Sequence, residues 1–190
     1  MRGENVEMVY FHVSRQLNIG DVVYPHKKSF SGWSEFAYNA NIQNYTDFMK
    51  YYDYLKNSEV FQDTERTFAK WLCETLFESI RQQRYPDYPT RIYGTFLCKE
   101  LNESRMFNRK EREGEGTIFV VDTKETVDFF DMQLFTDAES SLYDENGVSE
   151  EQYKYCVEMA VKYWESKNNE SVTKKEYICM ERLLLSEIVD

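Results

Sequence analysis

The chain has 190 residues, of which 42% are apolar and 16% aromatic, enough to bury the core of one domain. Its formal net charge of −11 argues against binding to nucleic acid or to an anionic membrane, because both depend on clustered Lys and Arg. The four cysteines lie far apart with no C-x-x-C pair, which is typical of a reduced protein rather than of a disulfide framework or zinc site. With no signal-peptide core and no run of membrane-spanning length, we expect a cytoplasmic protein.

The first half of the chain is expected to form two short strands and then helices. Residues 8–13 are apolar and aromatic, as in a buried strand, and residues 22–24 form a second extended piece. The segment 30–44 has no clean period, so we expect it to be irregular. Thr46 is a candidate N-cap for a following helix. The strongest helix is predicted over about 64–83, where apolar residues recur every four positions and charged residues occupy the other face.

The middle of the chain is expected to be rich in strands. Aromatic and β-branched residues predict a strand over 91–98, and residues 101–107 indicate a short helix. Residues 117–122 are the strongest strand in the chain. The segment 127–135 continues as a strand or loop that carries two acids in an aromatic setting.

One helix and one strand are expected near the C-terminus. Ser149 and Gln152 match a capping box, which opens a helix. Four of its residues are expected to face one way: Tyr153, Val157, Val161 and Trp164. Residues 177–189 are predicted to form a last strand. Strands, then helices, then strands again indicate an α+β fold rather than a doubly wound sheet.

Familiar catalytic motifs are absent from the sequence. There is no Gly-rich dinucleotide or phosphate loop, no G-x-S-x-G and no H-E-x-x-H. With two histidines and no compact acidic cluster, we expect no metal site. The remaining candidates, in chain order, are His12, Phe96, Asp128 and Asp131. A lone strand histidine is more often a core or turn residue, and an acid between aromatics is often solvated, so the residues alone leave both interpretations open.

The order of several short motifs resembles a known family. Residues 10–14, Tyr-Phe-His-Val-Ser, precede Leu-Asn-Ile-Gly-Asp-Val-Val-Tyr-Pro at 17–25. This resembles the opening of the rifampin-type ADP-ribosyltransferases, where an aromatic-x-His-Gly-Thr strand precedes a Gly-Asp-x-(apolar)-x-Pro stretch. Residues 116–122 and 129–135 are similar to that family's apolar strand and acidic turn, and residues 181–189 to its closing strand.

A second resemblance concerns the phrase Tyr-Pro-Asp-Tyr-Pro-Thr-Arg at residues 85–91. It closely resembles the DUF2441 family, which we associate with the same fold. The two resemblances together imply an ADP-ribosyltransferase-like split β-sheet core. They further imply a single domain over residues 1–190 with a helical insert at about 45–84. The segment 30–84 lies outside the rifampin-type match.

The resemblance implies a site that binds NAD between two small sheets. His12 would hydrogen-bond the adenosine ribose, and Phe96 stands where the family places a tyrosine that stacks on nicotinamide. The Phe96 ring can stack in the same way but lacks the hydroxyl. Asp131 would grip the nicotinamide ribose and stabilise an oxocarbenium-like transition state, with Asp128 as the second candidate for that role.

The resemblance also implies a phosphate side of the site. Arg91 is expected either to contact a phosphate or to form a salt bridge at a strand edge, and Ser29 and Lys28 would line the phosphates. The implied activity is NAD-dependent ADP-ribosyl transfer to a small molecule or a protein. The alternative is a non-catalytic binding protein on the same fold, with an acidic surface that meets a basic partner.

Overall fold

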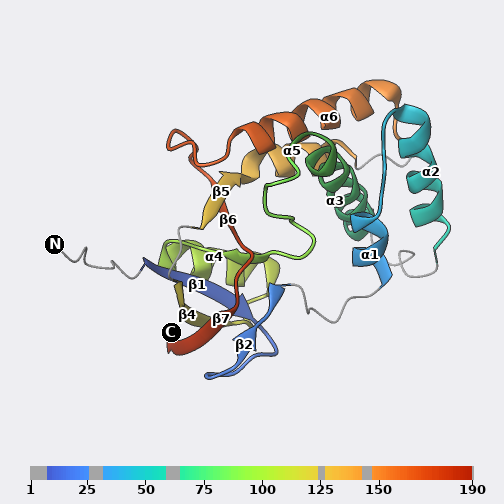
Figure 1. Cartoon of the computed structure of the whole chain (residues 1–190). Coiled ribbons are helices and arrows are strands. Elements are labelled where there is room, and N and C mark those ends of the chain that lie inside the picture. Colours follow the sequence, from blue (N-terminus) through green and yellow to red (C-terminus); the bar gives the residue numbers. More distant parts are fainter. Residues whose placement is uncertain (1–7, 26–31, 59–64, 124–126, 143–146, 190) are drawn as a thin grey trace. The chain divides into compact units, whose positions relative to one another are not determined.

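The computed structural model describes residues 8–25, 32–58, 65–123, 127–142 and 147–189. These residues form helices and antiparallel strands, which confirms the α+β class (Figure 1). The chain forms two compact units. The β unit comprises Met1–Lys28, Tyr93–Phe129 and Lys175–Asp190, and the helical unit comprises Ser29–Ile92 and Phe130–Lys174. That the two units form a single domain stays a prediction.

The larger sheet of the β unit has four antiparallel strands in the order β1-β4-β7-β2. The strands are β1 (Met8–Ser14), β2 (Val22–Val23), β4 (Thr117–Thr123) and β7 (Leu183–Val189). Alternate side chains of each strand point to the same face. On one face of this sheet, buried residues from neighbouring strands therefore line up and form half of a hydrophobic core, as Tyr10, Val121 and Leu185 do.

The smaller sheet has the strand order β3-β6-β5 and supplies the other half of that core. Its strands are β3 (Thr95–Leu97), β6 (Lys175–Cys179) and β5 (Asp128–Asp131), and the chain passes out of the β unit within β5. Leu97 and Tyr177 occupy opposite positions on β3 and β6 and are both buried in the core.

Helix α4 (Leu101–Glu111) packs against β1 and β4 of the larger sheet. It confirms the short helix predicted after the middle strand, and it continues one turn beyond the predicted end.

The helical unit is built around α3. The described residues of this unit form the helices α1 (Gly32–Tyr38), α2 (Tyr45–Lys56), α3 (Glu65–Arg84), α5 (Met132–Ser141) and α6 (Glu150–Glu165). Helix α3 contacts each of the other four, and Figure 1 shows it enclosed among them. No helix among the described residues is long and apolar enough to cross a membrane.

The predicted apolar stripe of α3 is confirmed, because Leu72, Leu76 and Ile80 are buried. Charged residues do occupy the other face, as predicted, but three of them, Glu74, Glu78 and Arg81, are also buried. The loop that follows α3 covers this face, because Thr90 and Arg91 donate to Glu78 and Glu74.

Two segments of the chain contain helices where none was predicted. Helix α1 lies within residues 30–44, and α5 begins at Met132 inside the segment predicted as a strand or loop. Helix α2 begins at Asn44, whose side chain accepts a hydrogen bond from the Asp47 amide, rather than at Thr46. Asn44 is the N-cap because its side-chain oxygen lies within reach of the backbone amide three residues later, and Asn is among the preferred N-cap residues.

Two strand predictions also need correction. Residues 91–93 form a turn, so the strand predicted over 91–98 is confined to Thr95–Leu97. The single closing strand predicted over 177–189 is two strands, β6 and β7, which belong to different sheets.

The capping box of α6 is confirmed, since Ser149 and Gln152 satisfy each other's backbone amides. Of the four residues predicted to face one way on α6, Trp164 is buried and the other three are only partly buried. The buried face consists of Cys156, Met159, Ala160, Tyr163 and Trp164.

Candidate functional site

The structure brings two of the predicted site residues together in the β unit. The imidazole Nδ1 of His12, on β1, lies 3.2 Å from the backbone oxygen of Phe96, on β3. A carbonyl oxygen can only accept, so this contact requires Nδ1 to carry the proton. In the neutral tautomer with this proton, Nε2 is the nitrogen that accepts. Both residues are partly buried.

A backbone bridge next to this pair explains why the two strands meet there. Phe11 and Cys98 exchange two hydrogen bonds of 2.9 Å in an antiparallel bridge. Tyr10 and Lys99 are the next residues along this bridge, and the Lys99 ammonium lies 4.5 Å from the centre of the Tyr10 ring. We call these contacts, together with His12 and Phe96, the β1–β3 seam.

Two side chains at the seam have unusual surroundings. Burial raises the pKa of the Cys98 thiol, and a hydrogen bond with Ser104 offsets part of that rise, so the thiol is neutral at physiological pH and a poor nucleophile. The hydroxyl of Thr95, which precedes Phe96, is fully buried and has no hydrogen-bond partner among the described residues. A buried hydroxyl without a partner is destabilising.

The two predicted acids fall in different units. Asp128, on β5, belongs to the β unit and is partly buried. It precedes Phe129, whose ring lies 5.3 Å from that of Tyr177 in the core, so Asp128 points to the opposite face of its strand. Asp131 belongs to the helical unit, where its carboxylate accepts a hydrogen bond of 3.0 Å from the Gln133 amide. Asp131 is therefore the N-cap of α5.

The structure places Arg91 in a salt bridge, one of the two roles expected for it, although in a turn and not at a strand edge. Its guanidinium donates to both carboxylate oxygens of Glu74, at 2.9 and 3.0 Å, and to the Tyr163 hydroxyl at 2.8 Å. The Phe135 ring covers it at 3.9 Å. Arg91 is 4% exposed, so it cannot reach a phosphate without breaking these contacts. Ser29 and Lys28 lie outside the described residues.

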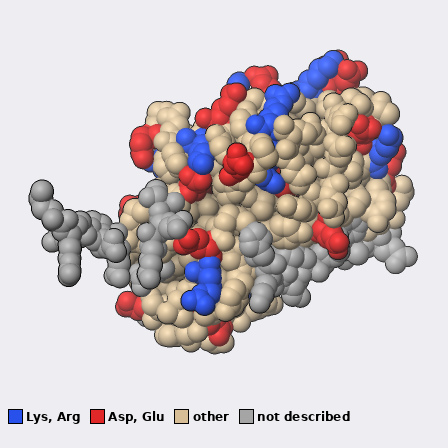
Figure 2. Space-filling model, in the orientation of Figure 1, with Lys and Arg blue, Asp and Glu red and all other residues tan. Residues whose placement is uncertain are grey.

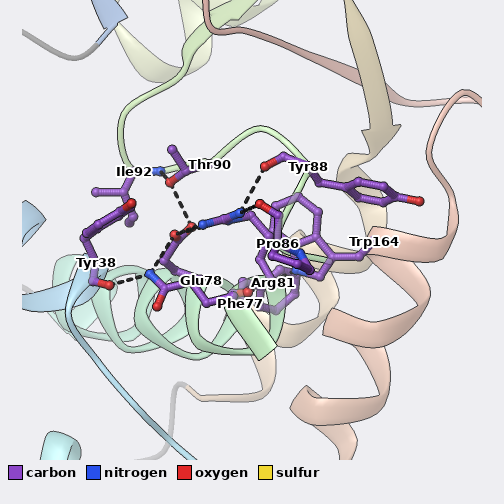
Figure 3. Close-up of polar contacts among 10 residues, drawn as sticks. Tyr38, Phe77, Glu78, Arg81, Pro86, Tyr88, Thr90, Ile92 and Trp164 are labelled. Atoms are coloured by element: carbon purple, nitrogen blue, oxygen red, sulfur yellow. Dashed lines mark hydrogen bonds and ion pairs between the residues drawn. The ribbon is translucent and has the colours of Figure 1, made fainter. Parts of the chain in front are cut away.

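A second buried ion pair holds the segment that precedes Arg91. Arg81 donates to Glu78 from both Nε and Nη2, and its Nη1 donates to the backbone oxygens of Pro86 and Tyr88, each at 3.0 Å (Figure 3). Thr90 donates to Oε2 of Glu78 at 2.8 Å, the same oxygen that accepts from Arg81 Nε. The loop that leaves α3 is thus tied to the helix by side chains of the helix itself.

These contacts give the motif at residues 85–91 a structural explanation. Its Thr90 and Arg91 side chains bind the buried acids of α3, and the backbone of its first proline and second tyrosine binds Arg81. On the outside of the loop, Tyr85 and Tyr88 stack with ring centres 5.3 Å apart. The motif therefore fixes the course of the chain after α3.

The chain matches one protein-family model over most of its length. A family model described as a protein of unknown function, DUF2441, matches residues 10–190. The chain belongs to the DUF2441 family. The match covers nearly all of both units and includes the motif at residues 85–91. No match is found among the curated proteins.

The buried polar residues of this DUF2441 protein were not identified from the sequence. Glu74, Glu78 and Arg81 recur at helical spacing and so form one stripe on α3. Helical spacing alone does not distinguish a buried stripe from a solvated one. Lys99 carried no signal at all, because its position depends on the pairing of Cys98 with a strand far away in the sequence.

Proposed function

We propose that this DUF2441 protein binds NAD and transfers its ADP-ribosyl group to an acceptor. The observation that carries the proposal is the hydrogen bond between the His12 ring and the Phe96 backbone. It joins, within one unit, two residues 84 positions apart that the resemblance to the rifampin-type enzymes assigns to dinucleotide binding. The α+β class and the two antiparallel sheets are compatible with the ADP-ribosyltransferase-like fold.

ADP-ribosyl transfer requires a group that stabilises positive charge on the ribose. The bond between the nicotinamide nitrogen and the ribose breaks, nicotinamide leaves with the electron pair, and the acceptor forms a bond to the same carbon and loses a proton. Positive charge develops on the ribose, so a carboxylate beside it stabilises the transition state. Asp128 lies in the same unit as His12, although its side chain leaves the face of β5 that is turned away from the core, and Asp131 caps α5, so the test has to include both acids.

His12 supports the proposal through its tautomer. In the neutral tautomer that donates from Nδ1 to Phe96, Nε2 is the accepting nitrogen, and the proposal assigns the ribose hydroxyl to it. Phe96 supplies an aromatic surface for the nicotinamide ring. Arg91 is left out of the proposed phosphate contacts because Glu74 neutralises it in the interior of the helical unit.

A titration with NAD tests the proposal. Saturation at 100 times the dissociation constant should stabilise the protein by about 2.7 kcal/mol, visible as a rise in melting temperature. His12→Ala should abolish the shift, whereas Glu151→Gln, at an exposed position on α6, should leave it intact. Slow release of nicotinamide from NAD, followed by chromatography, would establish turnover. The absence of any shift at millimolar NAD would contradict the proposal.

A second function is favoured by two of the same observations. Phe96 lacks the hydroxyl of the family's tyrosine, and Asp131 serves a helix cap. Both suit a binding protein without turnover, whose net charge of −11 favours a basic partner. On the face shown in Figure 2, however, acidic and basic side chains are interspersed. Salt-sensitive capture of a basic partner by a protein that does not bind NAD would support this second function.

A further inference from the structure

Lys99 occupies an unusual position for a cation in an acidic protein. Its ammonium lies 4.5 Å from the centre of the Tyr10 ring, and within the part of the chain that the structure describes it forms no ion pair. Several other cations lie within 4 Å of a carboxylate, among them Arg15, Lys50, Lys154 and Lys162. A ring face attracts a cation without neutralising its charge, so Lys99 keeps donors for an anion.

The β1–β3 seam sets the relationship between Lys99 and His12. Because Phe11 and Cys98 are paired, Tyr10 stands opposite Lys99. Tyr10 and His12 are two residues apart on β1, so their side chains leave the same face of the strand, about 7 Å apart along it. The seam therefore carries an ammonium and an imidazole on one side, separated by roughly the span of two strand residues.

We propose that Lys99 binds the pyrophosphate of the nucleotide whose ribose contacts His12. The inference rests on the proposed nucleotide binding and supplies the phosphate ligand that Arg91 cannot provide. The ribose hydroxyls and the phosphate of one nucleotide lie on opposite sides of its sugar ring, so one nucleotide can extend along β1 from His12 to the position of Tyr10, where the Lys99 ammonium lies. The compact ammonium acts as a point charge with three donors, as phosphate-binding lysines do.

The neighbouring acids oppose an anion at this place. Glu103, on α4, and Glu176, on β6, both raise the pKa of the Cys98 thiol through their charge, so their fields reach the seam. Removing the charge of Glu103 should therefore strengthen binding of the same phosphates that Lys99 attracts. Removing the charge of Lys99 and removing that of Glu103 should therefore change phosphate affinity in opposite directions.

The test compares ligands with and without phosphates on the intact chain. Affinities for NAD, ADP-ribose and adenosine are measured by calorimetry for the native protein, Lys99→Met and Lys99→Arg. Lys99→Met should weaken NAD and ADP-ribose at least about tenfold, as expected for one charge-assisted hydrogen bond, and leave adenosine unchanged. Lys99→Arg should keep most of the affinity, because it keeps the charge. Lys110→Met, an exposed lysine of α4, makes the same change in net charge and should have no effect.

Glu103→Gln provides a second measurement that does not depend on altering Lys99, and it should tighten ADP-ribose but not adenosine. Native protein that binds neither NAD nor ADP-ribose would overturn the proposed function itself. Native protein that binds both, together with a Lys99→Met variant of equal affinity, would overturn only the role of Lys99. A Lys99→Met variant that loses adenosine as well would also count against it, because the defect would then not be specific for phosphate.

Discussion

The guanidinium of Arg81 binds the carboxylate of Glu78, one turn earlier on α3, and the side chains are 7% and 0% exposed. Burying two charges away from water costs free energy, which is recovered only when both groups form further hydrogen bonds. Both groups do so here, because Arg81 also donates to two backbone oxygens of the following loop and Glu78 also accepts from Thr90. The pair therefore sets where the chain turns after α3.

Removing the charge of Glu78 should destabilise the protein strongly. Glu78→Gln keeps the size of the side chain but leaves Arg81 buried without a counter-charge, which costs about 3–5 kcal/mol in comparable cases. Urea denaturation measures the free energy of unfolding. The matched control is Glu158→Gln on α6, whose ion pair with Lys162 is 58% and 52% exposed and should contribute less than about 1 kcal/mol. Equal losses in the two variants would contradict the structural role of the buried pair.

Arg91 offers a test that separates a structural role from a ligand-binding role. Arg91→Lys keeps the charge but cannot donate to both oxygens of Glu74 and to Tyr163 at once. We expect the free energy of unfolding to fall by about 2–3 kcal/mol, the value of a hydrogen bond to a charged group. The affinity of the folded protein for NAD should not change. A variant of normal stability with weakened NAD binding would show instead that Arg91 contacts the phosphates of the ligand.

The sequence predicted those features of the fold whose signals are local. The stripe of Leu72, Leu76 and Ile80 and the capping box at Ser149 each lie within a few turns of one helix, so the chain nearby determines them. Burial of Glu78 could not be predicted in this way. It depends on a loop and on helices distant in sequence that cover the second face of α3.

Asp131 carries a local signal that the sequence analysis did not use. An aspartate directly before apolar residues at helical spacing is a helix start, and Phe135, Ala138 and Leu142 are indeed buried along α5. The aromatic residues before Asp131 favoured a strand and drew attention to the carboxylate as a catalytic group. Of the candidate site, the hydrogen bond between the His12 ring and the Phe96 backbone shows that these two residues lie side by side, while the roles predicted for them stay predictions.

The hydroxyl of Thr95 should cost stability, because it is fully buried without a partner among the described residues. Thr95→Val replaces it with a methyl group of similar size and should raise the free energy of unfolding by about 1 kcal/mol. Thr75→Val on α3 is the matched control. Thr75 is equally buried, but its hydroxyl donates to the Trp71 backbone oxygen at 2.7 Å, so the same change should destabilise. Urea denaturation of both variants should therefore give shifts of opposite sign.

Cys156 should make the protein less stable at alkaline pH. Burial raises the pKa of this thiol from its ordinary 9.0 to about 11, although a hydrogen bond with Ser141 acts in the opposite direction. In the unfolded chain the thiol ionises near pH 9, whereas in the folded chain it stays protonated. Its contribution is therefore complete below pH 9 and is lost as the pH rises to about 11, a change of up to about 3 kcal/mol.

Cys156→Ser isolates this effect, because a serine hydroxyl can still pair with Ser141 but does not titrate in the range. The variant should show a shallower fall in the free energy of unfolding between pH 9 and 11, measured by urea denaturation at each pH. Part of the slope should remain, since burial also raises the pKa of Cys73. Cys73→Ser should therefore remove a further part of it. Identical slopes for the native protein and Cys156→Ser would show that the Cys156 thiol ionises equally easily in both states, and hence that its burial does not oppose ionisation.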